Sequence, residues 1–186
     1  LGGKGANLAE MATIGLPVPP GFTITTEACK AYYDSGEKWP EGLAKQLDEY
    51  IRRLEDVTCK KLGDPHDPLL VSVRSGAAAS MPGMMDTVLN LGLNDNSVQG
   101  LIEKTGNPRF AWDCYRRFID MFGDVVAGVD HEHFEEVLHA MKDKKGVKFD
   151  TDLNADDLAE LCKRYKDVYK KHKGELFPQE PRQQLE

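Results

Sequence analysis

Hydrophobic and polar positions alternate with two different periods along this chain, and the change of period divides it into two parts. Up to about residue 93, apolar residues at helical spacing alternate with short apolar runs of the kind found in strands. Beyond residue 94 only the helical spacing remains. The pattern predicts helices over 5–14, 27–34, 41–61, 97–104, 108–127, 131–144 and 155–173, and strands over 22–25, 69–74 and 88–93. We therefore expect an α+β fold, with a mixed unit over 1–93 followed by an all-helical unit over 94–186.

Several residues mark where these elements should end. Gly15 is placed to terminate the first helix, Thr26 to cap the second and Asn154 to cap the last. The run from Leu69 to Arg74 is apolar enough to predict a buried strand. The final residues, 179–186, are polar and contain proline, which is typical of a linker or of a cut point.

Composition and charge narrow the classes of function. The 186 residues carry a net charge of −7, whereas a duplex-binding protein needs a basic surface, so we expect no nucleic-acid partner. No apolar run approaches the ~20 residues of a membrane span, so we expect no membrane partner. The four cysteines are too widely spaced for a zinc or redox motif, which favours reduced, mostly buried thiols and a cytoplasmic protein. The chain also begins without methionine, and we interpret it as a piece of a longer protein.

The segment from Arg74 to Thr87 is the most informative part of the sequence. An apolar run ends at Arg74, very small residues follow, and three of the six methionines lie within five positions around Pro82-Gly83. Small side chains let a ligand approach the backbone, and an arginine at a strand end can grip a phosphate through two N–H groups. The pattern predicts a loop over a phosphate-bearing ligand. A mobile surface loop, with Arg74 paired to a carboxylate, is the alternative.

Lys4 stands among glycines just before the first predicted helix. Free N–H groups at a helix start favour an anion, and a lysine adds a mobile positive charge. The spacing of a Walker A loop is absent, and an ordinary surface lysine is the alternative interpretation.

Arg117 follows a stripe of Phe110, Cys114 and Met121 along the helix predicted over 108–127. An arginine on an apolar face needs an anionic partner, which is either a carboxylate or a ligand. Arg116 faces Asp113 and Asp120 instead, so we expect it to form ordinary surface ion pairs.

The histidines do not predict a metal site. His131, His133 and His139 lack the i,i+4 spacing of helical zinc ligands, and no cysteine is nearby. No Ser-His-Asp or Cys-His arrangement can be derived from the sequence either.

Three segments together resemble a known family. They are Leu1–Ala12 with the turn Gly15–Thr23, the block Ser72–Asn94, and Arg109–Val126. These closely resemble the N-terminal ATP-binding region of the pyruvate, phosphate dikinases. The related phosphoenolpyruvate synthases, or water dikinases, share the first segment, but their loop after Val-Arg-Ser is typically longer and more acidic and lacks Ser-Met-Pro-Gly-Met-Met.

The resemblance implies a fold and a reaction. It implies a partial ATP-grasp domain, with 1–93 as its first subdomain and 94–186 as its helical second subdomain. The third subdomain, the phosphohistidine domain and the pyruvate-binding barrel would be absent from this chain. Members convert ATP, phosphate and pyruvate into AMP, diphosphate and phosphoenolpyruvate with Mg²⁺, whose ligands we expect outside this segment. The segment alone should be inactive, and its parent should be a homo-oligomer. The expected location is the cytoplasm, with the chloroplast as the alternative for a plant parent.

The resemblance also implies roles for individual residues. Lys4 and Arg74 match residues that contact the ATP phosphates, and Arg117 matches an arginine used in the step with inorganic phosphate. Arg74 and Arg117 are thus the catalytic candidates. The loop residues match a segment that covers the polyphosphate, and the ATP-binding candidates there are Ser80, Met81, Gly83, Met84, Met85, Asp86 and Thr87. A water dikinase, or a non-catalytic nucleotide-binding module from another class, are the alternatives.

Overall fold

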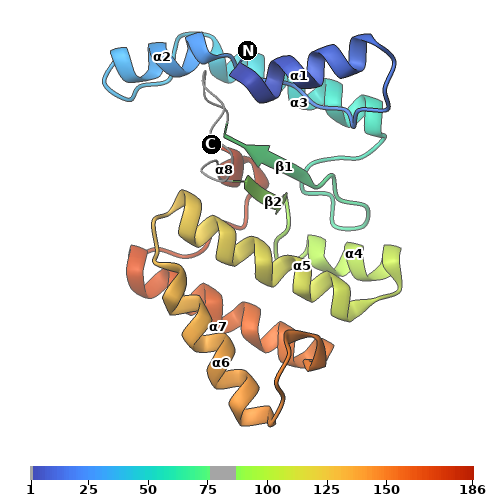
Figure 1. Ribbon diagram of the computed structural model, residues 1–186, viewed down its shortest axis with the longest axis vertical. Coiled ribbons are helices and arrows are strands. Elements are labelled where there is room, and N and C mark those ends of the chain that lie inside the picture. Colours follow the sequence, from blue (N-terminus) through green and yellow to red (C-terminus); the bar gives the residue numbers. More distant parts are fainter. Residues whose placement is uncertain (1, 76–86) are drawn as a thin grey trace. The chain divides into compact units, whose positions relative to one another are not determined.

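The computed structural model describes residues 2–75 and 87–186 of the chain (Figure 1). Contacts divide these residues into two compact units. The first comprises the described residues 2–59 with 74–75, and the second comprises 60–73 with 87–186.

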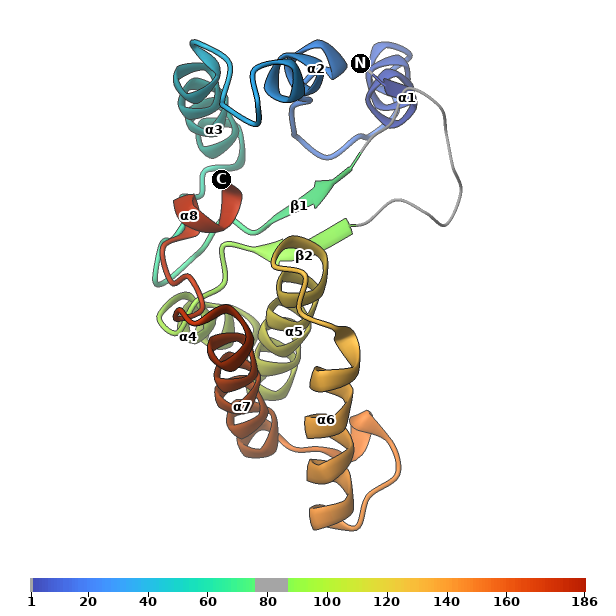
Figure 2. The same cartoon turned by 90° about the vertical axis from the view of Figure 1, so that its left-hand side faces the viewer.

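The first unit contains three helices, α1 (Gly2–Thr13), α2 (Thr26–Asp34) and α3 (Leu43–Thr58), close to the predicted positions (Figure 2). Among its described residues only Leu47 is fully buried. Apolar side chains on these helices are therefore largely exposed, as with Val57 at 68% of its full accessible area.

The helix ends follow from local chemistry. Gly15, with φ of 83°, ends α1 as predicted, and the next amide, Leu16 N–H, donates to Met11 O over 3.0 Å. Thr25 rather than Thr26 caps α2, because the Thr25 hydroxyl accepts from the Ala28 amide. The first helix begins at Gly2, so Lys4 lies inside its first turn and not ahead of it.

The strand predicted over 22–25 is wrong. In the described part of the chain no strand pairs with these residues, and a strand forms only where another pairs with it. The segment packs instead on α1, so close that a Cβ built on Gly5 would lie 2.8 Å from Thr23 Cγ2. The glycine therefore permits a close approach by the chain's own Thr23.

Two strands, β1 (Val71–Arg74) and β2 (Thr87–Leu91), form a two-stranded sheet and run in opposite directions (Figure 2). The strand predicted over 69–74 is present as Val71–Arg74, but the prediction that it is buried is wrong, because Ser72, Val73 and Arg74 are exposed. Val71 is the half-buried residue of β1, and it packs against the core of the second unit. In β2, Val88 and Leu91 are buried and belong to the core of the second unit.

The second unit is otherwise helical, as predicted. Its helices are α4 (Ser97–Thr105), α5 (Pro108–Met121), α6 (His131–Lys145), α7 (Ala155–Lys173) and the short α8 (Pro181–Leu185), with a 3₁₀ turn, η2 (Asp150–Asp152), before α7. The single helix predicted over 108–127 ends as a π-helix, η1 (Phe122–Val126). Asn154 caps α7 as predicted, with its side chain accepting from the Asp157 amide over 3.0 Å.

The core of this unit lies between α5 and α7, which are side by side (Figure 1). Its largest fully buried side chains include Tyr115, Phe118, Phe134 and Tyr165. Cys162 is also buried there and Cys114 is half-buried, but the prediction of mostly buried thiols fails for Cys29 and Cys59, which are exposed.

The C-terminal residues are folded, contrary to the linker expected from their composition. Gln184 of α8 is 4% exposed, and its amide group donates to the carbonyl oxygens of Leu93 and Pro178, each over 2.9 Å. Its own carbonyl accepts from the Gly92 amide over 3.0 Å. One buried polar side chain thus ties the tail to the end of β2, a link between distant residues that composition does not reveal. Among residues 2–75 and 87–186, no helix is long and apolar enough to cross a membrane.

Candidate functional site

Lys4 lies against the segment that follows β1. Its Nζ donates to the carbonyl oxygen of Ser75 over 3.1 Å. Ser75 is the residue after Arg74, so the two predicted cationic residues lie on neighbouring segments of the first unit, although they are 70 positions apart in the sequence. Lys4 is half-buried in the first turn of α1, where free N–H groups already favour an anion.

Arg74 is the last residue of β1 and is exposed. Among the described residues, Arg74 forms no ion pair with a carboxylate, so the alternative of a paired strand-end arginine finds no support there. An exposed guanidinium can bind phosphate oxygens, because its planar N–H groups donate in pairs.

Most of the predicted loop residues lie outside the described part of the chain. They are Ser80, Met81, Gly83, Met84, Met85 and Asp86. Thr87 is described, and it begins β2 with a half-buried side chain.

The helical argument for Arg117 is wrong in register. Arg116 is the buried arginine, at 5% of its accessible area, while the side chain of Arg117 is 62% exposed. The core face of α5 carries Ala111, Tyr115 and Phe118, one position beyond the stripe assumed from the sequence. Both stripes are apolar at helical spacing, so periodicity alone did not separate them.

Both arginines reach the same carboxylate. Arg116 donates to Asp113 Oδ1 from Nε over 3.1 Å and from Nη2 over 2.9 Å. Arg117 Nε lies 3.0 Å from the other oxygen, Oδ2. The carboxylate partner left open by the sequence is therefore present for Arg117, and Asp113 lies between the two cations.

Further cations gather around this pair, and the sequence argument missed them. Arg116 Nη2 is 3.8 Å from Asp150 Oδ2, and Lys142 Nζ is 3.0 Å from Asp150 Oδ1. Arg109 donates to the backbone carbonyls of Leu153 and Asp150. Four basic side chains therefore gather around Asp113 and Asp150 in an otherwise acidic protein. Only the tertiary fold brings 109–117 beside 142–153.

This environment acts on the Asp150 carboxyl group. Burial works to raise its pKa, but the hydrogen bond from Lys142 and the positive charges of Lys142, Arg116 and Arg117 outweigh that effect and lower it. For Arg116 too, burial and the neighbouring groups act in opposite directions on the pKa. Its burial opposes the charge, yet Tyr165 and Asp113 raise the pKa of its guanidinium above the ordinary value.

The histidines form polar pairs within the second unit. His131 Nδ1 lies 2.9 Å from Asp120 Oδ1, and this hydrogen bond raises the pKa of His131. Burial raises the pKa of the Asp120 carboxyl, despite the opposing effect of His131. In the described ranges, no group of three or more His, Cys, Asp or Glu side chains is arranged to hold a metal ion.

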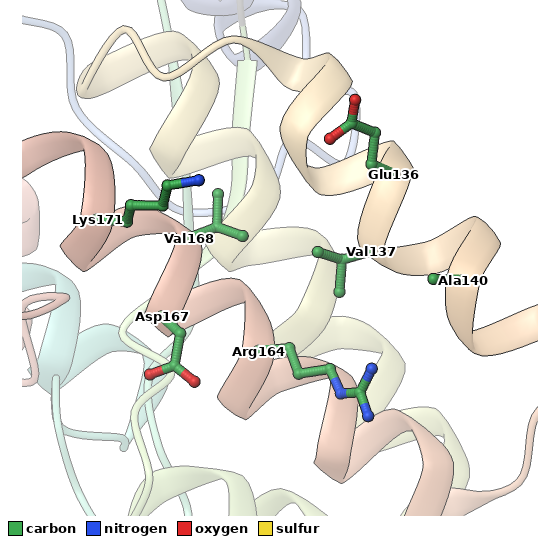
Figure 3. Close-up of a pocket in the computed structure, with 7 residues that line it drawn as sticks. All are labelled: Glu136, Val137, Ala140, Arg164, Asp167, Val168 and Lys171. Carbon is green, nitrogen blue, oxygen red and sulfur yellow. The ribbon is translucent and has the colours of Figure 1, made fainter. Parts of the chain in front are cut away.

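A surface hollow of about 360 Å³ lies between α6 and α7 (Figure 3). Val137 and Val168 form its floor, and Glu136, Arg164, Asp167 and Lys171 project around them. None of the predicted site residues lines it, so we place the candidate site at the arginines and not at this groove.

Comparison with known proteins identifies the class first. The chain matches a family of AMP- and ATP-binding domains over residues 1–41 and 38–172. The family is described as "Pyruvate phosphate dikinase, AMP/ATP-binding domain".

The curated relatives point the same way. The chain is 62% identical over its whole length to pyruvate, phosphate dikinase of Clostridium symbiosum, of which it covers 21%. It is also 62% identical to the chloroplastic pyruvate, phosphate dikinase 1 of Arabidopsis thaliana and 60% identical to pyruvate, phosphate dikinase 2 of Zea mays, covering 19% and 21% of them. The chain therefore belongs to the pyruvate, phosphate dikinase family, and it spans about a fifth of the length of these relatives.

Proposed function

We propose that this chain supplies part of the ATP-binding domain of a pyruvate, phosphate dikinase. In the whole enzyme, ATP, phosphate and pyruvate would give AMP, diphosphate and phosphoenolpyruvate through a phosphohistidine. Family membership supports the reaction class, and the relatives reported above bear the phosphate dikinase name, which favours that reaction over the water dikinase. The observation that carries the ATP-binding role is the contact between Lys4 and the segment following Arg74.

Lys4 and Arg74 would hold the phosphates of ATP. Their positive charges stand on adjoining segments, and phosphoryl transfer is catalysed mainly by positioning and by neutralising developing charge. The loop residues Ser80 to Thr87 would close over the polyphosphate. On this proposal, 1–93 and 94–186 correspond to the first two subdomains of an ATP-grasp domain.

Arg117 would serve the step that uses inorganic phosphate. Its exposed guanidinium lies beside other basic side chains, which is the electrostatic setting that an anionic substrate needs. The pairing with Asp113 does not oppose this role, because the side chain of Arg117 remains 62% exposed.

Mg²⁺ would neutralise phosphate charge in the whole enzyme. No described cluster of acidic side chains fits it, so its ligands are proposed to come from other parts of the parent. The same holds for the phosphohistidine and pyruvate-binding domains, for assembly into a homo-oligomer, and for a cytoplasmic or chloroplastic location.

The segment alone should bind part of ATP without turning it over, because two cationic contacts do not replace the remaining groups. We expect AMP formation from ATP by the full-length protein and none by the 186-residue chain mixed with the separate phosphohistidine domain. Chromatographic detection of AMP checks this. Formation of AMP by the mixture would show that the third subdomain is dispensable and would contradict the proposal.

A further inference from the structure

Asp113 occupies an unusual place between two consecutive arginines of α5. One of its oxygens receives two N–H groups of the buried Arg116, and the other lies 3.0 Å from Nε of the exposed Arg117. The Asp113 side chain is itself only 17% exposed. The Asp113 carboxylate therefore contacts both the buried guanidinium of Arg116 and the exposed guanidinium of Arg117.

The buried side of this arrangement is held firmly. The side chain of Arg116 is 6% exposed and lies against Tyr165 of the core. Asp150 approaches its Nη2 from the other side, and Lys142 in turn fixes Asp150. Because Arg116 cannot move without disturbing α6 and α7, the Asp113 carboxylate that it grips has a defined orientation.

The exposed side remains open. The side chain of Arg117 is 62% exposed, and its Nε lies 3.0 Å from Asp113 Oδ2. Within residues 2–75 and 87–186, no other carboxylate forms an ion pair with Arg117. A guanidinium carries planar pairs of N–H groups, which match two oxygens of a phosphate.

We propose that Asp113 is the positioning residue for Arg117, holding its guanidinium so that the terminal N–H groups face inorganic phosphate. This inference rests on the proposed role of Arg117 in the phosphate step. Asp113 itself does not touch the substrate. Because Arg116 holds the Asp113 carboxylate in a defined orientation, this carboxylate restricts the Arg117 side chain, which would otherwise sample many orientations.

The test uses the full-length enzyme containing this segment, with inorganic phosphate as the probe. Asp113→Asn keeps the shape of the side chain but removes its charge. We expect the KM for phosphate to rise about tenfold, since small misplacements of a positioning group can cost up to ~100-fold. The KM for ATP and the rate of phosphoenolpyruvate formation from the phosphorylated enzyme should stay within about twofold, because neither uses Arg117.

Two further variants separate positioning from folding. Asp113→Glu retains a carboxylate at i,i+4 from Arg117 and should restore most of the phosphate affinity. Asp150→Asn removes one of the groups that hold Arg116 but leaves the hydrogen bonds from Arg116 to Asp113, so it should raise the KM for phosphate less than Asp113→Asn does. Because KM does not depend on the fraction of the enzyme that is folded, the KM for phosphate can still be measured for a destabilised variant.

If Asp113→Asn does not fold, Arg117→Lys provides a second test. Lysine keeps the positive charge but lacks the Nε–H group that lies against Asp113. It should raise the KM for phosphate to a similar degree. Where Asp113→Asn does fold, combining the two changes should add little, because both break the same contact.

The outcomes separate the positioning role of Asp113 from the proposed role of Arg117 in the phosphate step. Arg117→Ala should impair the phosphate step by itself. If Arg117→Ala does so but Asp113→Asn leaves the KM for phosphate unchanged, the positioning role is refuted and the role of Arg117 stands. If Arg117→Ala leaves the phosphate step intact, the proposed function of Arg117 fails, and the inference about Asp113 fails with it.

Discussion

Replacing Arg74 by alanine in the full-length enzyme should reduce formation of AMP from ATP by about 10²–10³-fold, the usual cost of removing one preorganised donor from a transition state. The reason is that Arg74 ends β1 exposed, beside the carbonyl that Lys4 contacts, and would neutralise charge on the phosphates during transfer. Formation of phosphoenolpyruvate from the phosphorylated enzyme and pyruvate should be unaffected, because that half-reaction takes place after ATP has left. Rapid-quench assays of the two half-reactions measure both quantities.

A matched control is available in the same unit. Arg53 of α3 is an exposed arginine paired with Glu49 over 2.5 Å, and Arg53→Ala should leave both half-reactions within about twofold of their normal rates. An equal fall of both half-reactions in Arg74→Ala would indicate damage to the fold and would remove the support for its catalytic role.

Replacing Gly100 by alanine should destabilise the second unit, although helix propensity predicts the opposite. Alanine is about 1 kcal/mol more favourable than glycine inside a helix, and Gly100 lies within α4. A Cβ at this position, however, would lie 2.3 Å from Pro65 O and 2.7 Å from the carbonyl of His66. These are backbone atoms that cannot rotate away, so we expect a net loss of about 2 kcal/mol or more in the free energy of unfolding.

Urea denaturation of the chain followed by circular dichroism measures this loss. Gln99→Ala is the control, because Gln99 is exposed on the same helix and its replacement should change the free energy of unfolding by less than about 0.5 kcal/mol. An increase in stability for Gly100→Ala would mean that the segment 65–66 does not pack on α4 as described.

The long helices and their ends could be predicted from the sequence because their causes are local. Asn154 caps α7 and Gly15 ends α1 where the chemistry of each residue indicates. Thr25 and Thr26 are adjacent residues with the same side chain, so their order as cap could not be decided from composition alone.

Features that depend on tertiary partners could not be predicted. The segment 22–25 has the composition of a strand, but no described strand pairs with it. Gln184 lies in a polar tail, and the sequence does not indicate the three backbone groups to which its side chain bonds. The register of α5 failed for a different reason. The stripes led by Phe110 and Ala111 are both apolar, and packing against α7 selects the second.

The candidate site divides in the same way. Lys4 and Arg74 could be proposed from motif chemistry and resemblance. The surroundings of Arg117 could not, because Lys142 and Asp150 join Asp113 and Arg116 only after α6 and η2 fold back on α5.

The central claim is that Lys4 and Arg74 together receive the phosphates of a nucleotide, and calorimetric titration of Lys4→Ala tests it most directly. The full-length protein and the variant would each be titrated with ATP and with adenosine, which lacks phosphates. Lys30, an exposed lysine on α2, provides the control as Lys30→Ala.

A charge-assisted hydrogen bond contributes ~1.5–3 kcal/mol, so Lys4→Ala should weaken ATP binding by at least about tenfold. Binding of adenosine should not change, and Lys30→Ala should bind both ligands normally. Unchanged affinity for ATP in Lys4→Ala, or an equal loss for ATP and adenosine, would contradict the claim that this lysine contacts the phosphates.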